Sequence, residues 1–380
     1  MSSFATFVAQ PMIEDRKLRP ILEKVEARER LTYEDGVTLY RSSDILSLGY
    51  MANLVRDQLH GDVTYFNVNR HINPTDVCVA SCRLCAFGKR ARDPHAYTMS
   101  LEQVWEIAGR GYAEEVTEFH IVGGLHPELT LEWFCEMISG LKERYPGVHL
   151  KAFTMVEIAY FAKRAKLSIR ETIERLRAAG VDSMPGGGAE IFSERVRRII
   201  CDHKIDGDEW LETARAAHEA GLKSNCTMLY GHLETAEDLS DHLARLRALQ
   251  DETNGFVTFI PLAFHPANTA LQHLPPTTGF NDLKQIAVSR LMLDNIPHIK
   301  AYWIMMTPAI AQIAQRFGAN DIDGTVVEEK IYHDAGATTE QHLRRKDLLR
   351  LIREAGRDPV ERDTAYRPVT RTERAFTVLV

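Results

Sequence analysis

Strand-like and helix-like segments alternate along most of this 380-residue chain, and few folds accommodate that order. The strand-like segments are short and rich in β-branched and aromatic residues, and apolar residues recur with helical spacing between them. The predicted strands are residues 65–72, 118–124, 148–154, 181–186, 222–231, 255–264, 299–306 and 323–329. Strands that alternate with helices pair in parallel, so the chain is predicted to be an α/β protein with a TIM-type (β/α) barrel.

The barrel is predicted to occupy the middle of the chain, between two flanking segments. Residues 1–64 are predicted to be a helical N-terminal extension and residues 65–335 the barrel. Residues 336–380 are predicted to be a C-terminal helix and a tail that pack on the barrel. The last helix is expected over 339–355, because Gly356 is typical of the position that follows a helix C-terminus.

Charge and hydropathy exclude several classes of function. The hydrophobic fraction of 44% is enough for a large core, and the net charge of −7 argues against a general nucleic-acid-binding protein. The first residues lack the apolar stretch of a signal peptide, and no run of 18 or more apolar residues predicts a membrane span. We therefore expect a cytoplasmic protein with neither a nucleic acid nor a membrane as its partner.

Three cysteines follow the first predicted strand in the segment INPTDVCVASCRLCAF. Three residues separate Cys78 from Cys82, and two separate Cys82 from Cys85. A loop this short can place three thiolates around one face of a 4Fe–4S cluster, and one iron then keeps an open position because no fourth cysteine is near in sequence. A structural zinc site is the alternative, although it usually has four ligands and would need a residue such as His71.

Glycine- and histidine-containing motifs end other predicted strands. GGLHP (123–127) ends the second strand, PGGGAE (185–190) the fourth and FHP (264–266) the sixth. In (β/α) barrels the chemistry takes place on the loops at the C-terminal ends of the strands. The three motifs and the cysteine loop are therefore predicted to converge on one site, which a metal-binding scaffold without activity would not need.

Cysteines with this spacing after the first strand of a barrel resemble those of the radical S-adenosylmethionine (radical SAM) enzymes. The resemblance implies that Cys78, Cys82 and Cys85 bind a 4Fe–4S cluster, whose open iron chelates the amino and carboxylate groups of S-adenosylmethionine. It also implies that the reduced cluster cleaves S-adenosylmethionine to a 5′-deoxyadenosyl radical. The electron would come from a donor such as a flavodoxin or ferredoxin.

The same resemblance implies cofactor-binding residues at the strand ends. The residues that would contact S-adenosylmethionine are Phe87, Gly123, Gly124, Glu190 and Arg197. A tight strand-to-helix turn is the alternative role for the glycine pair. Two positions depart from the family pattern: Leu125 replaces the acidic residue that often follows the glycines, and Leu84 replaces the usual aromatic residue before the third cysteine.

Longer segments are similar to those of the aminodeoxyfutalosine synthases, which belong to the futalosine route of menaquinone biosynthesis. The similar segments span about residues 60–337 and include PGGGAEIFSERVRRIIC, FHPANT and DGTVVEEKIYH. Two sister families share part of this pattern, cyclic dehypoxanthine futalosine synthase and the radical enzyme of deazaflavin cofactor synthesis, and they are the alternatives. FHPANT and DGTVVEEKIYH favour the first family.

This resemblance implies a transferase that consumes S-adenosylmethionine as a co-substrate. The 5′-deoxyadenosyl radical adds to the enol ether carbon of 3-[(1-carboxyvinyl)oxy]benzoate, and the adduct rearranges with loss of its carboxyl carbon to give aminodeoxyfutalosine. The substrate carries two carboxylates and an apolar ring. Its pocket therefore needs cationic or hydrogen-bonding groups beside apolar walls.

Polar residues near the strand ends are candidates for that pocket. His126 and His265 each precede a proline in a loop and are predicted to be catalytic, although a structural, hydrogen-bonded imidazole is the alternative. Asn69, His71 and Tyr302 lie on predicted strands and are predicted to bind the substrate. The basic residues expected to dock an acidic electron donor are Arg83, Lys89, Arg90 and Arg92.

Overall fold

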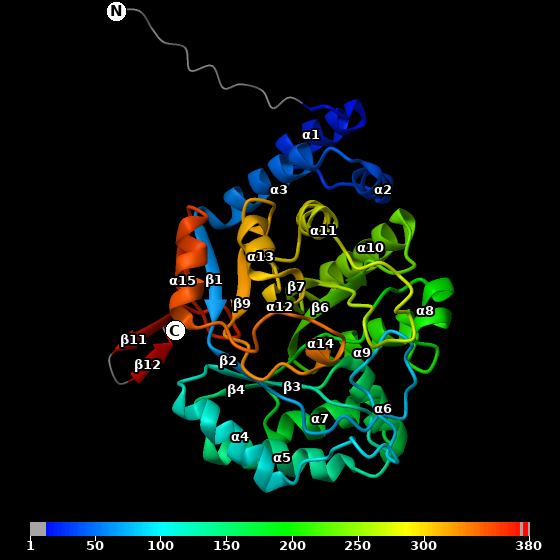
Figure 1. Cartoon of the computed structure of the whole chain (residues 1–380), viewed down its shortest axis with the longest axis vertical. Helices are drawn as coiled ribbons and strands as arrows, with labels where there is room; N and C mark the ends of the chain where they lie inside the picture. The colour runs from blue at the N-terminus through cyan, green and yellow to red at the C-terminus, as the bar shows by residue number, and fades with distance from the viewer. Residues whose placement is uncertain (1–12, 373–374, 379–380) are drawn as a thin grey trace, which may run out of the picture.

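A curled sheet of seven parallel strands forms the centre of the computed structural model, which describes residues 13–372 and 375–378 (Figure 1). Each strand pairs in parallel with the next one in the chain. The strands are β2 (Asn69–Ile72), β3 (Glu118–Ile121), β4 (His149–Ala152), β5 (Ser183–Met184), β6 (Lys223–Tyr230), β7 (Phe256–Ala263) and β8 (His298–Ile299). Every connection carries at least one helix, so the predicted α/β barrel is confirmed.

A second parallel sheet completes the ring between β8 and β2. Its strands, in the order β10-β1-β9, are β1 (Val63–Asn67), β9 (Asp321–Gly324) and β10 (Asp358–Glu361). On one side, Ala301 N–H donates to Asp321 O at 2.8 Å. On the other side, His71 N–H donates to Val327 O at 2.9 Å. These contacts join β9 and the residues after it to both edges of the seven-stranded sheet.

Helices cover the outside of the barrel, and many begin at a cap that the sequence supplies. Ser100 and Thr154 each accept a hydrogen bond from the backbone N–H three residues later, and the side chains of Gln103 and Glu157 accept one from the cap in return. The larger helices after β2 are α4 (Leu101–Ala113), α5 (Leu131–Arg144), α6 (Met155–Ala165), α7 (Ile169–Ala179), α8 (Glu194–Ile200), α9 (Gly207–Glu219), α10 (Ala236–Thr253), α11 (Gly279–Met292), α13 (Pro308–Ala314) and α15 (Arg345–Glu354).

The N-terminal helices pack on the barrel helices at the top of Figure 1. They are the 3-10 helix η1 (Arg16–Leu18), α1 (Arg19–Glu26), α2 (Tyr33–Arg41) and α3 (Ile45–His60). Helix α2 contacts α10, and α3 contacts α11. Among the described residues, none of the helices combines the length and apolar character needed to cross a membrane.

The first predicted strand, residues 65–72, is two strands in the structure. The chain breaks at Val68, so that β1 pairs with β9 and β10 whereas β2 pairs with β3. Both parts are largely buried, as a continuous strand would be. The local pattern therefore could not show where the chain changes its neighbours.

The last two predicted strands are shorter in the structure. Residues 303–306 form helix α12 (Trp303–Met306) and not the end of a strand over 299–306. The Trp303 indole N–H donates to Gly324 O at 2.8 Å, so this apolar run packs against β9 without extending the sheet. Strand β9 ends at Gly324, and Val326 follows with a φ of 48°, which lies outside the β region.

The C-terminal region contains more regular structure than the predicted helix and tail. The helix predicted over 339–355 begins only at Arg345. The predicted tail contains β10 and the antiparallel pair β11 (Val369–Thr372) and β12 (Ala375–Val378). Strand β10 pairs in parallel with one edge of β1. The buried Arg362 that follows β10 donates to Asp321 Oδ2 at 2.6 Å. The division of the chain into three domains stays a prediction.

Candidate active site

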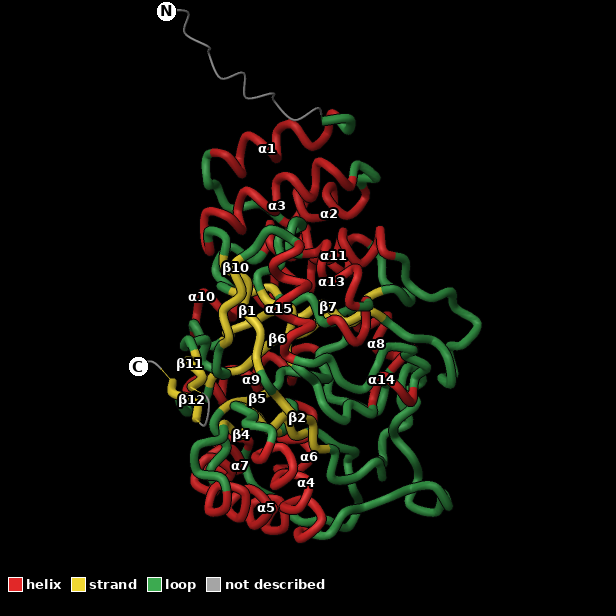
Figure 2. The backbone as a smooth tube through the Cα atoms, turned by 60° about the vertical axis from the view of Figure 1, so that its left-hand side comes forward, coloured by secondary structure: helices red, strands yellow, loops and turns green. Residues whose placement is uncertain are grey.

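A cavity of about 500 Å³ opens at the C-terminal ends of the barrel strands. Figure 2 shows the long loops gathered there, together with α8 and α14 (Ile331–Asp334), on the side away from the β11–β12 hairpin. The cysteine loop, the glycine pair 123–124, residues 187–190 and the histidine of FHP all contribute to the lining. The structure thus brings together the four loops that the sequence placed at strand ends.

Backbone hydrogen bonds hold the cysteine loop in a closed turn. Cys78 N–H donates to Lys89 O at 2.8 Å, and Lys89 N–H donates to Asp76 O at 2.8 Å. The Lys89 ammonium also binds the Asp76 carboxylate at 2.8 Å. Gly124 N–H donates to Thr75 O at 2.9 Å, which fastens the glycine pair to the start of the loop.

The three cysteines fit a multi-iron cluster better than a single metal ion. All three are free thiols that line the cavity. A Cβ placed on Gly88 would lie 3.8 Å from both Cys78 Sγ and Cys85 Sγ, and Gly88 N–H donates to Cys85 Sγ at 3.4 Å. In the described part of the chain, no three His, Cys, Asp or Glu side chains converge tightly enough to hold one ion, as tetrahedral zinc requires. Thiolates that bind separate corners of a cluster do not need to converge so closely.

Burial keeps the thiols of Cys82 and Cys85 protonated until a metal binds. It raises the pKa of Cys82 to about 12 and also raises the pKa of Cys85, whereas the Lys204 ammonium lowers both. Metal binding displaces thiol protons, so cluster assembly here releases protons and the charge of Lys204 stabilises the resulting thiolates.

Glu190 and Lys204 form a buried ion pair beside the cysteines. Lys204 Nζ lies 2.5 Å from Glu190 Oε1, and both residues line the cavity. Burial alone would lower the pKa of Lys204, but the charges of Glu190 and Cys82 raise it well above its usual value. The sequence placed Glu190 in the site but missed Lys204, because a lysine in the ordinary segment CDHKIDG carries no motif.

Arg197 lies outside the cavity lining, in contrast to its predicted contact with the cofactor. Its buried guanidinium donates to Ala189 O at 2.6 Å and to Ile191 O at 3.2 Å, and it also contacts Ile205 O. These bonds fix the loop that presents Glu190. In the structure the guanidinium thus positions this loop, and its contact with the cofactor stays a prediction.

The glycine pair lines the cavity and is held by a glutamate that the sequence did not single out. Gly123 N–H donates to Glu157 Oε1 at 3.0 Å, and Thr154 Oγ1 donates to Glu157 Oε2 at 2.8 Å. Burial raises the pKa of Glu157 to about 7, although the same hydrogen bonds oppose the shift. Glu157 was missed because its spacing from Thr154 indicates only a helix capping box.

Only one of the two predicted catalytic histidines lies in the cavity lining. His265 lines the cavity, and its Nε2 lies 2.9 Å from Met305 O, so that this nitrogen carries the proton. His126 is outside the lining, and its Nδ1 accepts the backbone N–H groups of Glu128 at 3.0 Å and Leu129 at 3.1 Å. His126 therefore organises the turn before α5, as the structural alternative expects, and its catalytic role stays a prediction.

Two of the three predicted substrate-binding residues line the cavity. These are His71 and Tyr302, both more than nine-tenths buried. Asn69 is outside the lining because its Oδ1 accepts Val326 N–H at 2.9 Å and so fixes the segment after β9. The Tyr302 hydroxyl has no hydrogen-bond partner among the described residues, which leaves it available to a ligand.

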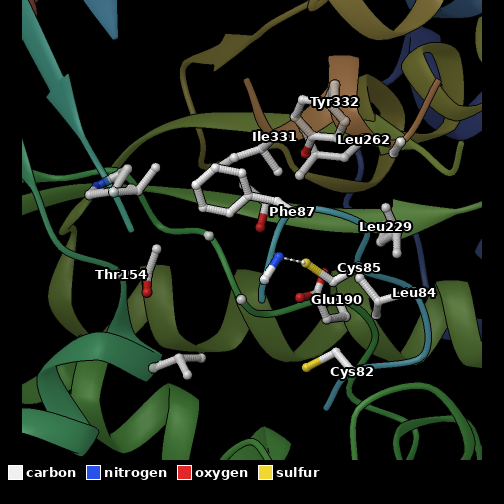
Figure 3. Close-up of a pocket in the computed structure, with 18 of the residues that line it drawn as sticks. Cys82, Leu84, Cys85, Phe87, Thr154, Glu190, Leu229, Leu262, Ile331 and Tyr332 are labelled. Atoms are coloured by element: carbon white, nitrogen blue, oxygen red, sulfur yellow. Dashed lines mark hydrogen bonds between the residues drawn. The ribbon is translucent and has the colours of Figure 1, made fainter. Parts of the chain in front are cut away.

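Apolar side chains occupy the centre of the cavity wall. Figure 3 shows the Phe87 ring between Cys85 on one side and Tyr332 and Leu262 on the other. Leu84, at the position usually aromatic in the resembling family, also lines the cavity. Flat apolar surfaces next to the cysteines suit a purine base.

Comparisons with known proteins identify the family. A model described as the radical SAM superfamily matches residues 72–246, and one described as the CofH/MqnC C-terminal region matches residues 253–375. The chain is 47% identical over 361 residues to the aminodeoxyfutalosine synthase of Thermus thermophilus, covering 94% of this chain and 97% of the relative. The chain belongs to the radical SAM superfamily, in the family that includes aminodeoxyfutalosine synthase.

Other relatives agree with this assignment of a radical SAM enzyme. The aminodeoxyfutalosine synthase of Streptomyces coelicolor is 46% identical, with 92% of this chain and 93% of the relative covered. A 5-amino-6-(D-ribitylamino)uracil–L-tyrosine 4-hydroxyphenyl transferase of Methanopyrus kandleri is 41% identical, with coverages of 84% and 88%. The cofactors of a radical SAM enzyme are a 4Fe–4S cluster and S-adenosylmethionine, and the three thiols fit the cluster.

Solved structures share the fold of this radical SAM enzyme. Methylornithine synthase has a TM-score of 0.71 at 19% identity, covering 89% of this chain and 97% of that chain. The FeFe-hydrogenase maturase HydG from Carboxydothermus hydrogenoformans has a TM-score of 0.73 at 16% identity, with coverages of 92% and 80%. At this identity the likeness supports the barrel architecture alone.

Proposed function

We propose that this radical SAM enzyme is an aminodeoxyfutalosine synthase. The observation that carries the proposal is full-length similarity, at 47% and 46% identity, to two proteins of that name. The uracil–tyrosine transferases, at 41% identity and below, are the second candidate. The cavity has the mixed lining that an aromatic dicarboxylate needs, with Lys300, Lys204 and His71 beside Phe87 and Leu262.

In the proposed reaction the adenosyl group of S-adenosylmethionine joins the substrate. One electron cleaves the sulfonium C–S bond, methionine leaves, and the 5′-deoxyadenosyl radical adds to the enol ether carbon of 3-[(1-carboxyvinyl)oxy]benzoate. The adduct rearranges through the ring and loses its carboxyl carbon as bicarbonate or carbon dioxide. Bound at Cys78, Cys82 and Cys85, the cluster supplies that electron and its open iron.

The chain's own residues bind and orient the reactants in this proposal. Gly123 and Gly124 present backbone beside the cysteine loop, where the amino acid part of S-adenosylmethionine would lie. Glu190, held by Lys204, would bind its ribose, and Phe87 would contact its adenine. His265 and Tyr302 line the same cavity and would face the substrate.

Mass spectrometry with isotopically labelled S-adenosylmethionine tests the proposal. The anaerobically reconstituted and reduced enzyme is incubated with 3-[(1-carboxyvinyl)oxy]benzoate, and parallel samples contain 5-amino-6-(D-ribitylamino)uracil with tyrosine. We expect the whole labelled adenosyl group in the product of the first incubation. Free 5′-deoxyadenosine without that adduct would contradict the proposal, and turnover of the second pair would establish the second candidate.

We also propose that an acidic one-electron carrier protein docks beside the cysteine loop. Gly88 is exposed and lies against the sulfurs of Cys78 and Cys85, which are themselves partly exposed, so this face brings a docked carrier close to the cluster ligands. Arg83 and Arg92 nearby are exposed. Lys89 is engaged by Asp76, and Arg90 contacts backbone oxygens of the loop, so these two support the loop more than the docking surface.

Charge reversal at the exposed arginines tests this docking surface. The variant Arg83→Glu with Arg92→Glu is expected to lower the rate with reduced flavodoxin by about tenfold or more at low salt, because steering by charge sets the association rate. The rate with a small chemical reductant should not change. Arg110→Glu with Arg170→Glu, on the outer helices α4 and α7, makes the same charge change as a control. Equal flavodoxin-dependent rates in both variants would exclude this surface.

A further inference from the structure

The cavity has a second polar region at the end away from the cysteines. The cysteine loop follows the C-terminal end of β2, whereas Glu118 is the first residue of the neighbouring parallel strand β3. Glu118 and the cysteines therefore lie toward opposite ends of the barrel, yet both line the cavity. His71, His120 and Lys300 line it with Glu118, and His120, Lys300 and Glu118 all act electrostatically on His71.

Lys300 is a buried ammonium group that does not use all of its N–H donors. Its side chain is 4% exposed, and Nζ lies 3.1 Å from Asp323 Oδ1. An ammonium has three N–H donors, and no second hydrogen bond from Nζ is present within the described residues. The structure therefore presents an incompletely satisfied cation to the cavity, where a ligand anion gains strength from the low dielectric constant.

The anionic neighbours of Lys300 already have partners. Glu118 binds Lys151 Nζ at 2.8 Å and accepts the Thr364 hydroxyl at 2.6 Å. Lys151 does not line the cavity. Asp323 binds Lys300 and has a φ of 65°, a conformation that costs free energy in a non-glycine residue and is typical of functional sites.

Two further polar side chains beside Lys300 lack partners. His71 stacks on His120 with ring centroids 4.5 Å apart, and no side-chain hydrogen bond of His71 occurs in the described structure. Burial lowers the pKa of His71 well below its usual value, so its neutral ring offers one N–H. The buried Tyr302 hydroxyl is also unpartnered and lies near Asp323.

We propose that Lys300, His71 and Tyr302 form an anion subsite that binds the ring carboxylate of the aromatic substrate. This inference rests on the proposed function and adds the orientation of the substrate. The reacting alkene carbon must lie near the cysteines, where the radical is generated. The vinyl carboxylate is one bond from the alkene, so the ring carboxylate is the one that reaches past Tyr302 to the end of the cavity where His71 and Lys300 lie beside Glu118.

The test compares two ligands in the holoenzyme. Calorimetric dissociation constants are measured anaerobically, without reductant, for 3-[(1-carboxyvinyl)oxy]benzoate and for 2-phenoxyprop-2-enoate, which lacks the ring carboxylate. We expect the wild type to prefer the first ligand by about 30- to 100-fold, as for a hydrogen-bonded charge. The variant Lys300→Met with Asp323→Asn, which removes both partners of the ion pair, should reduce that preference to threefold or less.

A matched variant and a milder variant control for damage to the fold. Lys142→Met with Asp182→Asn makes the same two substitutions in an ion pair of which neither member lines the cavity, and should keep the preference. Tyr302→Phe removes only an unpartnered hydroxyl and should lower the preference about threefold to tenfold. Because the readout is a ratio within each variant, a general loss of stability cancels.

The outcomes separate this inference from the proposed function. A wild type that binds both ligands equally would overturn the subsite, as would an unchanged preference in both Lys300→Met with Asp323→Asn and Tyr302→Phe. Adduct formation by the wild type is measured separately, so its absence would overturn the proposed function. Adduct formation with an unchanged preference in those variants would overturn the subsite alone.

Discussion

Alanine at Cys78, Cys82 or Cys85 is expected to remove the cluster and, with it, all radical chemistry. Each thiol lines the cavity, and no other cysteine of the described chain does, so a lost ligand has no substitute within the cavity lining. Iron and sulfide per chain should fall to background after anaerobic reconstitution, and adduct formation should fall by about 1,000-fold or more. Electron paramagnetic resonance of the reduced protein and product analysis measure the two effects.

Cys135→Ala provides the matched control. Cys135 lies on α5, is only partly buried, and is absent from the cavity lining. This variant should keep the iron content and the activity of the wild type. A Cys85→Ala protein that still bound four irons and formed the adduct would show that the cluster has other ligands.

Gly124→Ala is expected to have the second largest effect, because it changes the backbone beneath the cysteine loop. An added Cβ would lie 2.7 Å from the carbonyl carbon of Val77 and in collision with its oxygen, and backbone atoms cannot move aside as a side-chain tip can. Val77 directly precedes Cys78. We expect a loss of about 3 kcal/mol or more in the free energy of unfolding, together with poor cluster retention.

Two other glycines test whether the collision is the cause. Gly147 has no atom within 4 Å of an added Cβ, so Gly147→Ala should fold normally. Gly123→Ala brings its Cβ to 3.2 Å from Thr75 O, a tight contact that should cost less than the change at Gly124. Chemical denaturation and iron analysis rank the three variants. Equal stability of Gly124→Ala and Gly147→Ala would contradict the expectation.

The parts of the fold and site that could be predicted depend on local sequence. The alternation of strand and helix patterns identified the barrel, since each pattern is set by its own residues. The cysteine spacing and the glycine motifs identified the loops of the cavity, because those loops follow strands whose ends must meet. Cys82, Gly123 and Glu190 were found in this way.

The parts of the site that could not be predicted from the sequence depend on contacts between distant segments. Lys204 acquires its place only because Glu190 and the cysteine loop fold around it, and Lys300 acquires its place from Asp323. Arg197 and His126 are predicted from sequence to act on ligands, and in the structure their side chains bind backbone groups. An arginine or histidine can bind either a ligand or a backbone group, and the local sequence does not show which of the two it binds.

The position of β1 has a consequence for the way this enzyme is made. Both neighbours of β1 are translated long after it: Tyr65 of β1 pairs with Asp321 of β9, and Val63 pairs with Asp358 of β10. Contacts of such separation form slowly and cannot form on the ribosome until the last segment emerges. Nascent chains should therefore leave both edges of β1 unpaired for most of their synthesis, and the ring closes only when β9 and β10 have been made.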